Sequence, residues 1–198
     1  PFADYSAVPT YYVSKAAREH VTVSLSGDGG DENFGGYRRY RFDLRERQLR
    51  RRLPAWFRSG VLGPMASLYP KADWLPRVLR AKSTLANLAA DEAEAYCRSV
   101  GFLDERAKAS MATAGVRRAV GAYSSVEVIR RHMARAGGED LDRLIYTDFK
   151  TWLPDDMLTK VDRASMAVGL EVRVPLLDHG FVEYARRVPG SMKIEGSQ

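Results

Sequence analysis

Cysteine is nearly missing from this sequence of 198 residues, because Cys97 is the only one, and long apolar runs are missing altogether. A single cysteine excludes an internal disulfide and fits a reducing compartment, so we expect a cytoplasmic protein. A membrane-spanning helix needs about 20 consecutive apolar residues, and no stretch comes near that length. The first ten residues show no basic leader before an apolar stretch, so we predict no signal peptide.

Acidic residues are outnumbered, 25 against 31 Lys and Arg, and the formal net charge is +6. Much of the basic excess lies in residues 38–52. A basic stretch with aromatic neighbours can bind nucleic acid, but no helix-turn-helix, zinc or RNA-binding signature accompanies this one. We therefore interpret residues 38–52 as a solvated helix face or a face that meets another domain, and expect no nucleic-acid partner.

Strand signals are also scarce, and only Val21–Leu25 is typical of a buried strand. A lone strand needs a sheet to pair with, so we expect its partner strands outside this sequence. Leu170–Val174 is predicted to be extended. The apolar spacing elsewhere predicts helices. Their expected ranges are Pro9–Glu19, Arg39–Arg52, Ala55–Tyr69 with breaks at Gly60, Gly63 and Pro64, Trp74–Leu88, Asp91–Val100, Asp104–Met111, Gly115–Ala134, Asp140–Trp152, Pro154–Val168 and Phe181–Arg187.

Glycines and acids alternate directly after the predicted strand, in Ser26–Tyr37 (SGDGGDENFGGY). Ligand crevices of α/β sheets lie outside the carboxyl ends of strands, so this loop is well placed for a site. Gly27, Gly29 and Gly30 would let backbone amides approach a ligand without an intervening side chain, and Ser26 adds a hydroxyl.

Two carboxylates of this loop, Asp28 and Asp31, point to a metal-assisted phosphate site. The loop lacks the Gly-Lys-Ser/Thr of a Walker A motif, and carboxylates alone would repel phosphate. Mg²⁺ binds through one or two carboxylates together with substrate phosphates. The pattern therefore predicts one wall of a Mg·ATP or Mg·pyrophosphate site, although a plain turn rich in Gly and Asp fits the spacing equally well.

A second motif lies in Leu153–Asp178 (LPDDMLTKVDRASMAVGLEVRVPLLD). If its first part is helical, Asp156, Lys160 and Arg163 share one face at i, i+4 and i+7. Two cations on that face could neutralise a leaving phosphate group. The alternative is a surface helix with salt bridges between neighbouring turns.

Together the two motifs resemble the C-terminal synthetase domain of glutamine-hydrolysing asparagine synthetases. The strings SGDGGDE followed by FGGY, and KVDRASMA followed by EVRVPLLD, are highly specific to that family. The resemblance implies an α/β parent with a Rossmann-like ATP-pyrophosphatase fold, of which residues 1–198 are the C-terminal part, mainly α-helical with one or two strands.

The resemblance also implies the chemistry. ATP adenylates the side-chain carboxylate of aspartate, releasing pyrophosphate, and ammonia made from glutamine in an N-terminal glutaminase domain attacks the acyl group. Carried over by position, Asp31 would hold Mg²⁺, Asp28 would lie near the acyl-adenylate, and either Lys160 or Arg163 would face the pyrophosphate. The residues expected at the nucleotide are Ser26, Gly27, Gly29 and Gly30.

Three departures from the family pattern matter. Asn33 stands where an apolar residue is usual, so we expect the helix after the loop to pack differently. Asp28 stands where some members have Glu. The family's pyrophosphate loop, Ser-Gly-Gly-x-Asp-Ser, is not in this sequence and is expected upstream. Cys97 lies in an apolar helical stretch, and we interpret it as structural rather than as the glutaminase nucleophile.

Two other functions stay open on the sequence alone. Relatives of this domain amidate sugars or peptides for surface polymers, or close β-lactam rings, and they share the ATP motifs while using another carboxylate. A non-catalytic module that binds nucleic acid through residues 38–52 is the third hypothesis. Because half of the nucleotide site lies elsewhere, we expect the isolated 198 residues to be inactive. A homodimer is left open.

Overall fold

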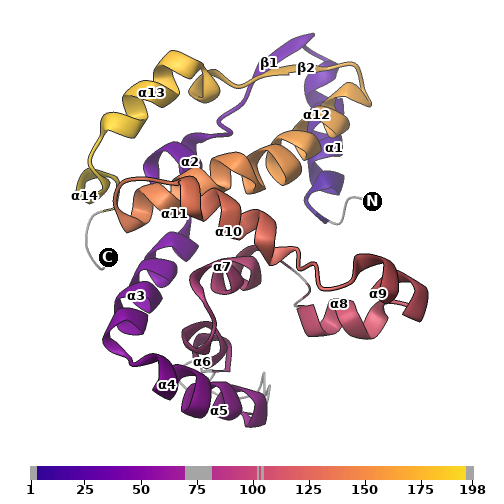
Figure 1. The fold of residues 1–198 in the computed structure, drawn as a ribbon. Helices are drawn as coiled ribbons and strands as arrows, with labels where there is room; N and C mark the ends of the chain where they lie inside the picture. Colours follow the sequence, from indigo (N-terminus) through magenta and orange to yellow (C-terminus); the bar gives the residue numbers. More distant parts are fainter. Residues whose placement is uncertain (1–3, 70–81, 102, 104, 195–198) are drawn as a thin grey trace. The chain divides into compact units, whose positions relative to one another are not determined.

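The computed structural model describes residues 4–69, 82–101, 103 and 105–194. By its internal contacts the chain forms two compact units. The first unit contains residues 1–37 and 136–198, and the second contains residues 38–135. Figure 1 shows the elements of each unit. None of the helices in the described part of the chain is long and apolar enough to cross a membrane.

The first unit contains a parallel pair of strands, β1 (Val23–Leu25) and β2 (Glu171–Arg173), which lie side by side in Figure 1. Ser24 lies opposite Val172 in the register. The expectation that β1 pairs only with strands outside the sequence is therefore wrong, since β2 is its partner. The expectation that β1 is buried is also wrong, because Leu25 is 70% exposed. The side chains on that face meet no covering element in the described part of the chain.

The helices of the first unit surround the ends of these strands. The helix α1 (Ala7–Arg18) packs along α12 (Thr159–Met166), which follows a π-helical segment, Leu153–Leu158. The apolar part of the core of this unit receives three side chains from α11 (Asp140–Lys150). Its buried side chains include Leu141, Leu144, Ile145, Leu153, Leu170 and Ala185. The remaining elements are α2 (Gly30–Phe34), α11 (Asp140–Lys150), a 3-10 helix (Pro175–Leu177), α13 (His179–Arg187) and α14 (Gly190–Lys193).

The second unit has only helices as regular elements among its described residues. Its helices are α3 (Arg38–Arg52), α4 (Ala55–Phe57), a π-helical segment (Arg58–Leu62), α5 (Gly63–Leu68), α6 (Lys82–Ala89), α7 (Glu92–Val100), α8 (Glu105–Met111), α9 (Ala114–Val120) and α10 (Val126–Arg135). Asp91 caps α7 by accepting a hydrogen bond from the Glu94 amide at 2.8 Å. Such a cap satisfies one of the free amides at a helix start. The helix α7 packs against both α3 and α10.

Most predicted helices are confirmed within a few residues, but the prediction was wrong for two of them. The predicted helix Gly115–Ala134 is divided into α9 and α10, because Gly121 takes the left-handed φ of 61° and ends α9. The predicted breaks at Gly60 and Gly63 are absent, since a π turn carries the chain through them. Residues 74–81 of the predicted helix Trp74–Leu88 lie outside the described residues.

The basic stretch 38–52 is only partly a solvated face. The Arg47 side chain is 3% exposed and forms an ion pair with Glu92 at 3.1 Å, linking α3 to α7. Arg50 is also buried and donates to the carbonyl of Asn87 on α6 at 2.8 Å. Our interpretation of the stretch as a solvated face or a face that meets another domain therefore does not describe these two residues, which hold helices of the second unit together.

We expect Arg47→Ala to lower the free energy of unfolding by about 2–4 kcal/mol, because it removes one partner of a largely buried ion pair. Arg45→Ala is the matched control, since Arg45 lies two residues earlier on the same helix and is exposed. That change should stay within about 0.5 kcal/mol of the wild type. Urea unfolding followed by circular dichroism measures both. Equal losses in the two variants would show that Arg47 has no structural role.

Candidate functional site

The acidic loop continues directly from β1. The Ser26 amide donates to the carbonyl of Arg173 at 2.9 Å, which extends the pairing of the two strands by one residue. The Ser26 hydroxyl donates to the Asp28 carboxylate, and the Asp28 amide donates back to that hydroxyl at 3.3 Å. The first turn of the loop is therefore fixed by its own side chains, and both residues are half-buried.

The glycines of the loop allow the second motif to approach closely. Gly29 has a φ of 87°, and a Cβ there would lie 2.3 Å from Leu177 Cδ2. A Cβ on Gly30 would lie 3.3 Å from Leu176 Cδ1. A side chain at position 29 is therefore excluded both by backbone conformation and by space. The structure thus brings the turn after β2 against the loop after β1.

Asn33 joins these two segments to each other. The sequence alone did not predict this role. Its side chain is almost fully buried in α2, and Nδ2 donates to the carbonyls of Gly29 at 2.9 Å and Leu176 at 2.7 Å. The signal available in the sequence was a polar residue at a position expected to be apolar. The expectation that the helix after the loop packs differently is consistent with this arrangement.

Asp31, the predicted metal ligand, is exposed at the start of α2. Its carboxylate makes no hydrogen bond or ion pair with a described residue, and it lies against the backbone of Gly36, where a Cβ would come 2.0 Å from Asp31 Oδ1. In the described part of the chain, no three His, Cys, Asp or Glu side chains gather closely enough to form a metal cage. Mg²⁺ does not need such a cage, because it keeps several waters and binds phosphate oxygens. An open carboxylate suits that mode of binding.

A buried polar cluster lies behind the loop. Glu32 is 1% exposed and accepts a hydrogen bond from the Tyr37 hydroxyl at 2.7 Å. Burial raises the pKa of Glu32, and the nearby charge of Asp148 on α11 adds to the rise, although the bond from Tyr37 opposes it. Burial and the charge of Glu32 raise the pKa of Tyr37 well above its usual range. This cluster anchors α2 through its buried side. Asp31, on the same helix, is the acid that faces outward.

The two candidate cations have different environments. Lys160 is buried, and its Nζ donates to Asp4 Oδ2 at 3.0 Å and to the Ser6 hydroxyl at 2.8 Å, which lie beside the start of α1. Arg163, one turn later on α12, is exposed, and its side chain has no hydrogen bond or ion pair with a described residue. The third member of the predicted charged face, Asp156, falls in the π-helical segment, and burial raises its pKa.

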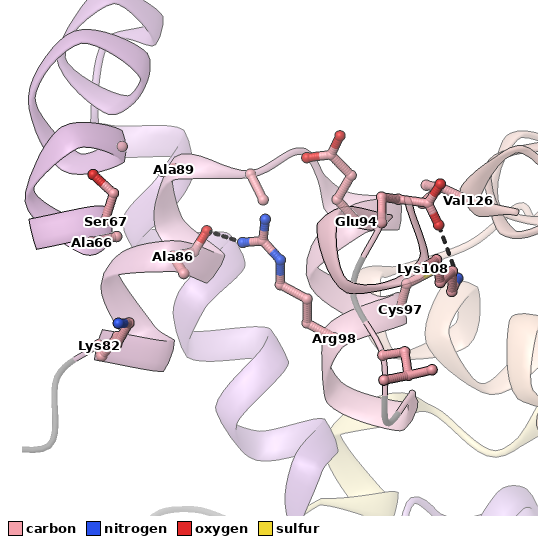
Figure 2. A pocket seen from close by; sticks show the side chains of 14 residues that line it. Ala66, Ser67, Lys82, Ala86, Ala89, Glu94, Cys97, Arg98, Lys108 and Val126 are labelled. Atoms are coloured by element: carbon pink, nitrogen blue, oxygen red, sulfur yellow. Dashed lines mark hydrogen bonds and ion pairs between the residues drawn. The ribbon is translucent and has the colours of Figure 1, made fainter. Parts of the chain in front are cut away.

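The structure also contains a cavity of about 610 Å³ in the second unit (Figure 2). Small residues of α5 and α6 line one side, and the Arg98 guanidinium crosses it to the carbonyl of Ala86 at 2.5 Å. None of the predicted site residues lines it. Cys97 does, and burial raises its thiol pKa, which disfavours the thiolate needed of a nucleophile. The structure therefore agrees with a structural role for Cys97.

Comparisons with known proteins all point to one family. The family described as asparagine synthase matches residues 1–198. The chain is 31% identical over 194 residues to "Asparagine synthetase [glutamine-hydrolyzing] 1" of Bacillus subtilis, covering 98% of this chain and 29% of that protein. It is 38% identical over 173 residues to "Putative asparagine synthetase [glutamine-hydrolyzing] 2" of Methanocaldococcus jannaschii, covering 84% of this chain and 30% of that protein.

A third relative, "Putative asparagine synthetase [glutamine-hydrolyzing]" of Mycobacterium bovis, is 32% identical over 206 residues, covering 98% of this chain and 28% of that protein. The chain thus spans less than a third of the length of these relatives. No solved structure matches the chain significantly.

The partly buried ion pair between Asp4 and Lys160 predicts a pH-dependent contribution to stability. Burial alone would raise the pKa of Asp4, but hydrogen bonds from Ser6 and Lys160 outweigh it and lower the pKa below its usual value of 3.8. A carboxyl whose pKa falls on folding stabilises the protein above its unfolded pKa, and that contribution is lost as pH falls through the folded pKa.

We therefore expect Asp4→Asn to be less stable than the wild type at neutral pH, with the difference shrinking as pH falls below 3.8. Denaturant unfolding of both proteins, from pH 7 down to about pH 3, measures that difference. The role assigned to this pair would be ruled out by a difference that stays constant over the range. Asp155→Asn, at an exposed acid of the same unit, serves as the control.

Proposed function

Since the chain belongs to the asparagine synthase family, we propose that it is the C-terminal part of the synthetase domain of a glutamine-hydrolysing asparagine synthetase. The observation that carries this proposal is the contact between the two ATP-type motifs. Gly29 and Gly30 of the first motif lie against Leu176 and Leu177 of the second, and β1 and β2 end side by side. Motifs so far apart in sequence thus form one continuous surface at the carboxyl ends of parallel strands, where α/β proteins bind ligands.

The proposed reaction has two steps. First, a carboxylate oxygen of the aspartate side chain attacks the α-phosphorus of ATP, and the bond to pyrophosphate breaks. Then the ammonia nitrogen attacks the acyl carbon of the aspartyl-AMP, AMP leaves with the electron pair of the broken C–O bond, and a proton is lost from nitrogen. The products are asparagine, AMP and pyrophosphate. Ammonia comes from glutamine in the glutaminase part of the longer polypeptide.

The loop after β1 supplies one wall of the nucleotide site in this proposal. The Ser26 hydroxyl and the backbones of Gly27, Gly29 and Gly30 lie at the nucleotide phosphates. Asp28, held by Ser26, lies near the acyl-adenylate. Asp31 would hold Mg²⁺, which would supply positive charge at the phosphates of the nucleotide. The exposure of Asp31 and its lack of a hydrogen bond or ion pair with any described residue support this role.

Arg163 is the better candidate for the cation that faces pyrophosphate. It is exposed and makes no ion pair in the described part of the chain, so its charge is available to a ligand. Lys160 is already neutralised by Asp4. We therefore assign Lys160 a structural role between α1 and α12 and Arg163 the contact with the leaving group.

The remainder of the site lies outside these residues. The exposed side chains of β1 are what the helices of a larger α/β domain would cover, and the chain spans only 29% of the Bacillus subtilis relative. We propose that the parent domain has a Rossmann-like ATP-pyrophosphatase fold, with the pyrophosphate loop and the glutaminase domain in the rest of the polypeptide. The reaction then takes place in the cytoplasm, in line with the single cysteine.

Asp31→Asn in the complete polypeptide should lower aspartate-dependent pyrophosphate release by roughly 100-fold or more, because it removes a charge that acts on the transferring phosphates. The assay contains Mg·ATP and ammonium, with and without aspartate. Glu183→Gln is the control, since Glu183 is an exposed acid on α13 of the same unit, and this variant should keep wild-type release. Wild-type rates in Asp31→Asn would contradict the metal role, and release that ignores aspartate would move the acceptor to another carboxylate, such as a surface-polymer sugar, peptide or β-lactam precursor.

The roles of Arg163 and Lys160 can be distinguished by measuring pyrophosphate release and melting temperature for a variant at each position. Arg163→Ala should lower pyrophosphate release by roughly 10- to 100-fold, because a charge facing the leaving group is lost, while the melting temperature stays unchanged. Lys160→Ala should lower the melting temperature by several degrees, since it removes the buried cation that pairs with the half-buried Asp4 and joins α1 to α12. Thermal unfolding beside the same assay measures both. Our assignment fails if the Arg163 variant is fully active and the Lys160 variant is inactive at unchanged stability.

A further inference from the structure

The carbonyl of Gly29 receives two hydrogen bonds from one residue. The Asn33 backbone amide donates to it at 3.0 Å, as the first bond of α2, and Asn33 Nδ2 donates to it at 2.9 Å. Gly29 is also the residue whose positive φ turns the chain from the loop into α2. Asn33 therefore holds the loop at the position where its direction changes.

The second hydrogen bond of Nδ2 reaches the other motif. It ends on the carbonyl of Leu176 at 2.7 Å, in the 3-10 helix that follows β2. A single amide group thus joins two segments that are 143 residues apart in the sequence. The leucines of that 3-10 helix cover Gly29 and Gly30, so any movement of the 3-10 helix would open or close the space beside the loop.

Burying the Asn33 side chain costs folding free energy. The side chain is 1% exposed, and its Oδ1 has no hydrogen-bond partner among the described residues. A buried polar atom without a partner destabilises a protein, and an apolar side chain of similar size would avoid that penalty. An apolar side chain would also remove both donor bonds and leave only van der Waals contact between the loop and the 3-10 helix.

We propose that Asn33 is a positioning residue, which couples the acidic loop to the turn after β2 and so fixes the place of the Asp28 and Asp31 carboxylates. Its effect on catalysis rests on the function proposed above, whereas the coupling itself does not. Asn33 touches neither substrate nor metal in this scheme. It acts by restricting the loop, because small displacements of positioned groups reduce rates strongly.

Hydrogen exchange of the complete polypeptide, measured by mass spectrometry, tests the coupling without any activity. In Asn33→Leu we expect roughly tenfold faster exchange in both residues 26–37 and residues 174–179, because two hydrogen bonds that close this region are lost. Asn87→Leu is the matched control. It deletes a side-chain bond to Glu46 at 3.1 Å in the second unit and should leave both segments unchanged. If Asn33→Leu fails to fold, Asn33→Asp keeps the size of the side chain and removes the same two donors.

Unchanged exchange in residues 174–179 would overturn the proposal, as would an equal effect of Asn87→Leu. The catalytic consequence has its own measurement, the Mg²⁺ concentration that gives half-maximal pyrophosphate release. We expect this concentration to rise roughly tenfold in Asn33→Leu and to stay at the wild-type value in Asn87→Leu. A fall in activity that follows stability alone, with no change in Mg²⁺ dependence, would reduce Asn33 to a packing residue. A wild-type protein without pyrophosphate release would refute the proposed function, while the exchange result would still decide the coupling.

Discussion

Three residues of parallel pairing between β1 and β2 bring the two sequence motifs of the first unit together. Parallel strands end at the same edge of a sheet, so the segments that leave β1 and β2 emerge side by side. The acidic loop and the 3-10 helix then meet at Gly29, where nothing larger than glycine fits. The amide of Asn33 and the buried cluster of Glu32, Tyr37 and Asp148 hold this junction from behind. A site that looks like two separate motifs in the sequence is thus one piece of structure.

The sequence predicted the local features of the candidate site well. A loop of alternating glycine and acid after a strand is recognisable without neighbours, and Ser26–Asp31 lies where that pattern places it. The capped helix α7 and the apolar spacing of α11 were equally predictable, because helix signals depend on residues a few positions apart. The strand β2 was predicted only as an extended segment, since two of its three residues are charged and its partner lies far away in the sequence.

What the sequence could not show was which charges are buried. The sequence left open whether Lys160 or Arg163 faces the pyrophosphate, and only the folded chain shows that Lys160 meets Asp4, a partner more than 150 residues away. Arg47 was expected on a solvated face or a face that meets another domain, and instead it joins two helices of its own unit through Glu92. The sequence spacing within a helix assigns side chains to faces, but tertiary packing decides which face is covered. Asn33 shows the same limit, because its importance depends on the Leu176 carbonyl that only the folded chain brings near.

The division of the chain into two units has a consequence for how the site forms. The second unit is a continuous segment, residues 38–135, inserted between the two parts of the first. During synthesis from the N-terminus, β1 and the acidic loop therefore leave the ribosome long before β2 exists to pair with them. All residues of the inserted unit are synthesised before β2. This unit can therefore fold early, as a helical assembly of low contact order. The acidic loop gains its contacts with the segment after β2 last, so a truncated or stalled chain would contain a folded helical unit while the contact between the two motifs has not formed.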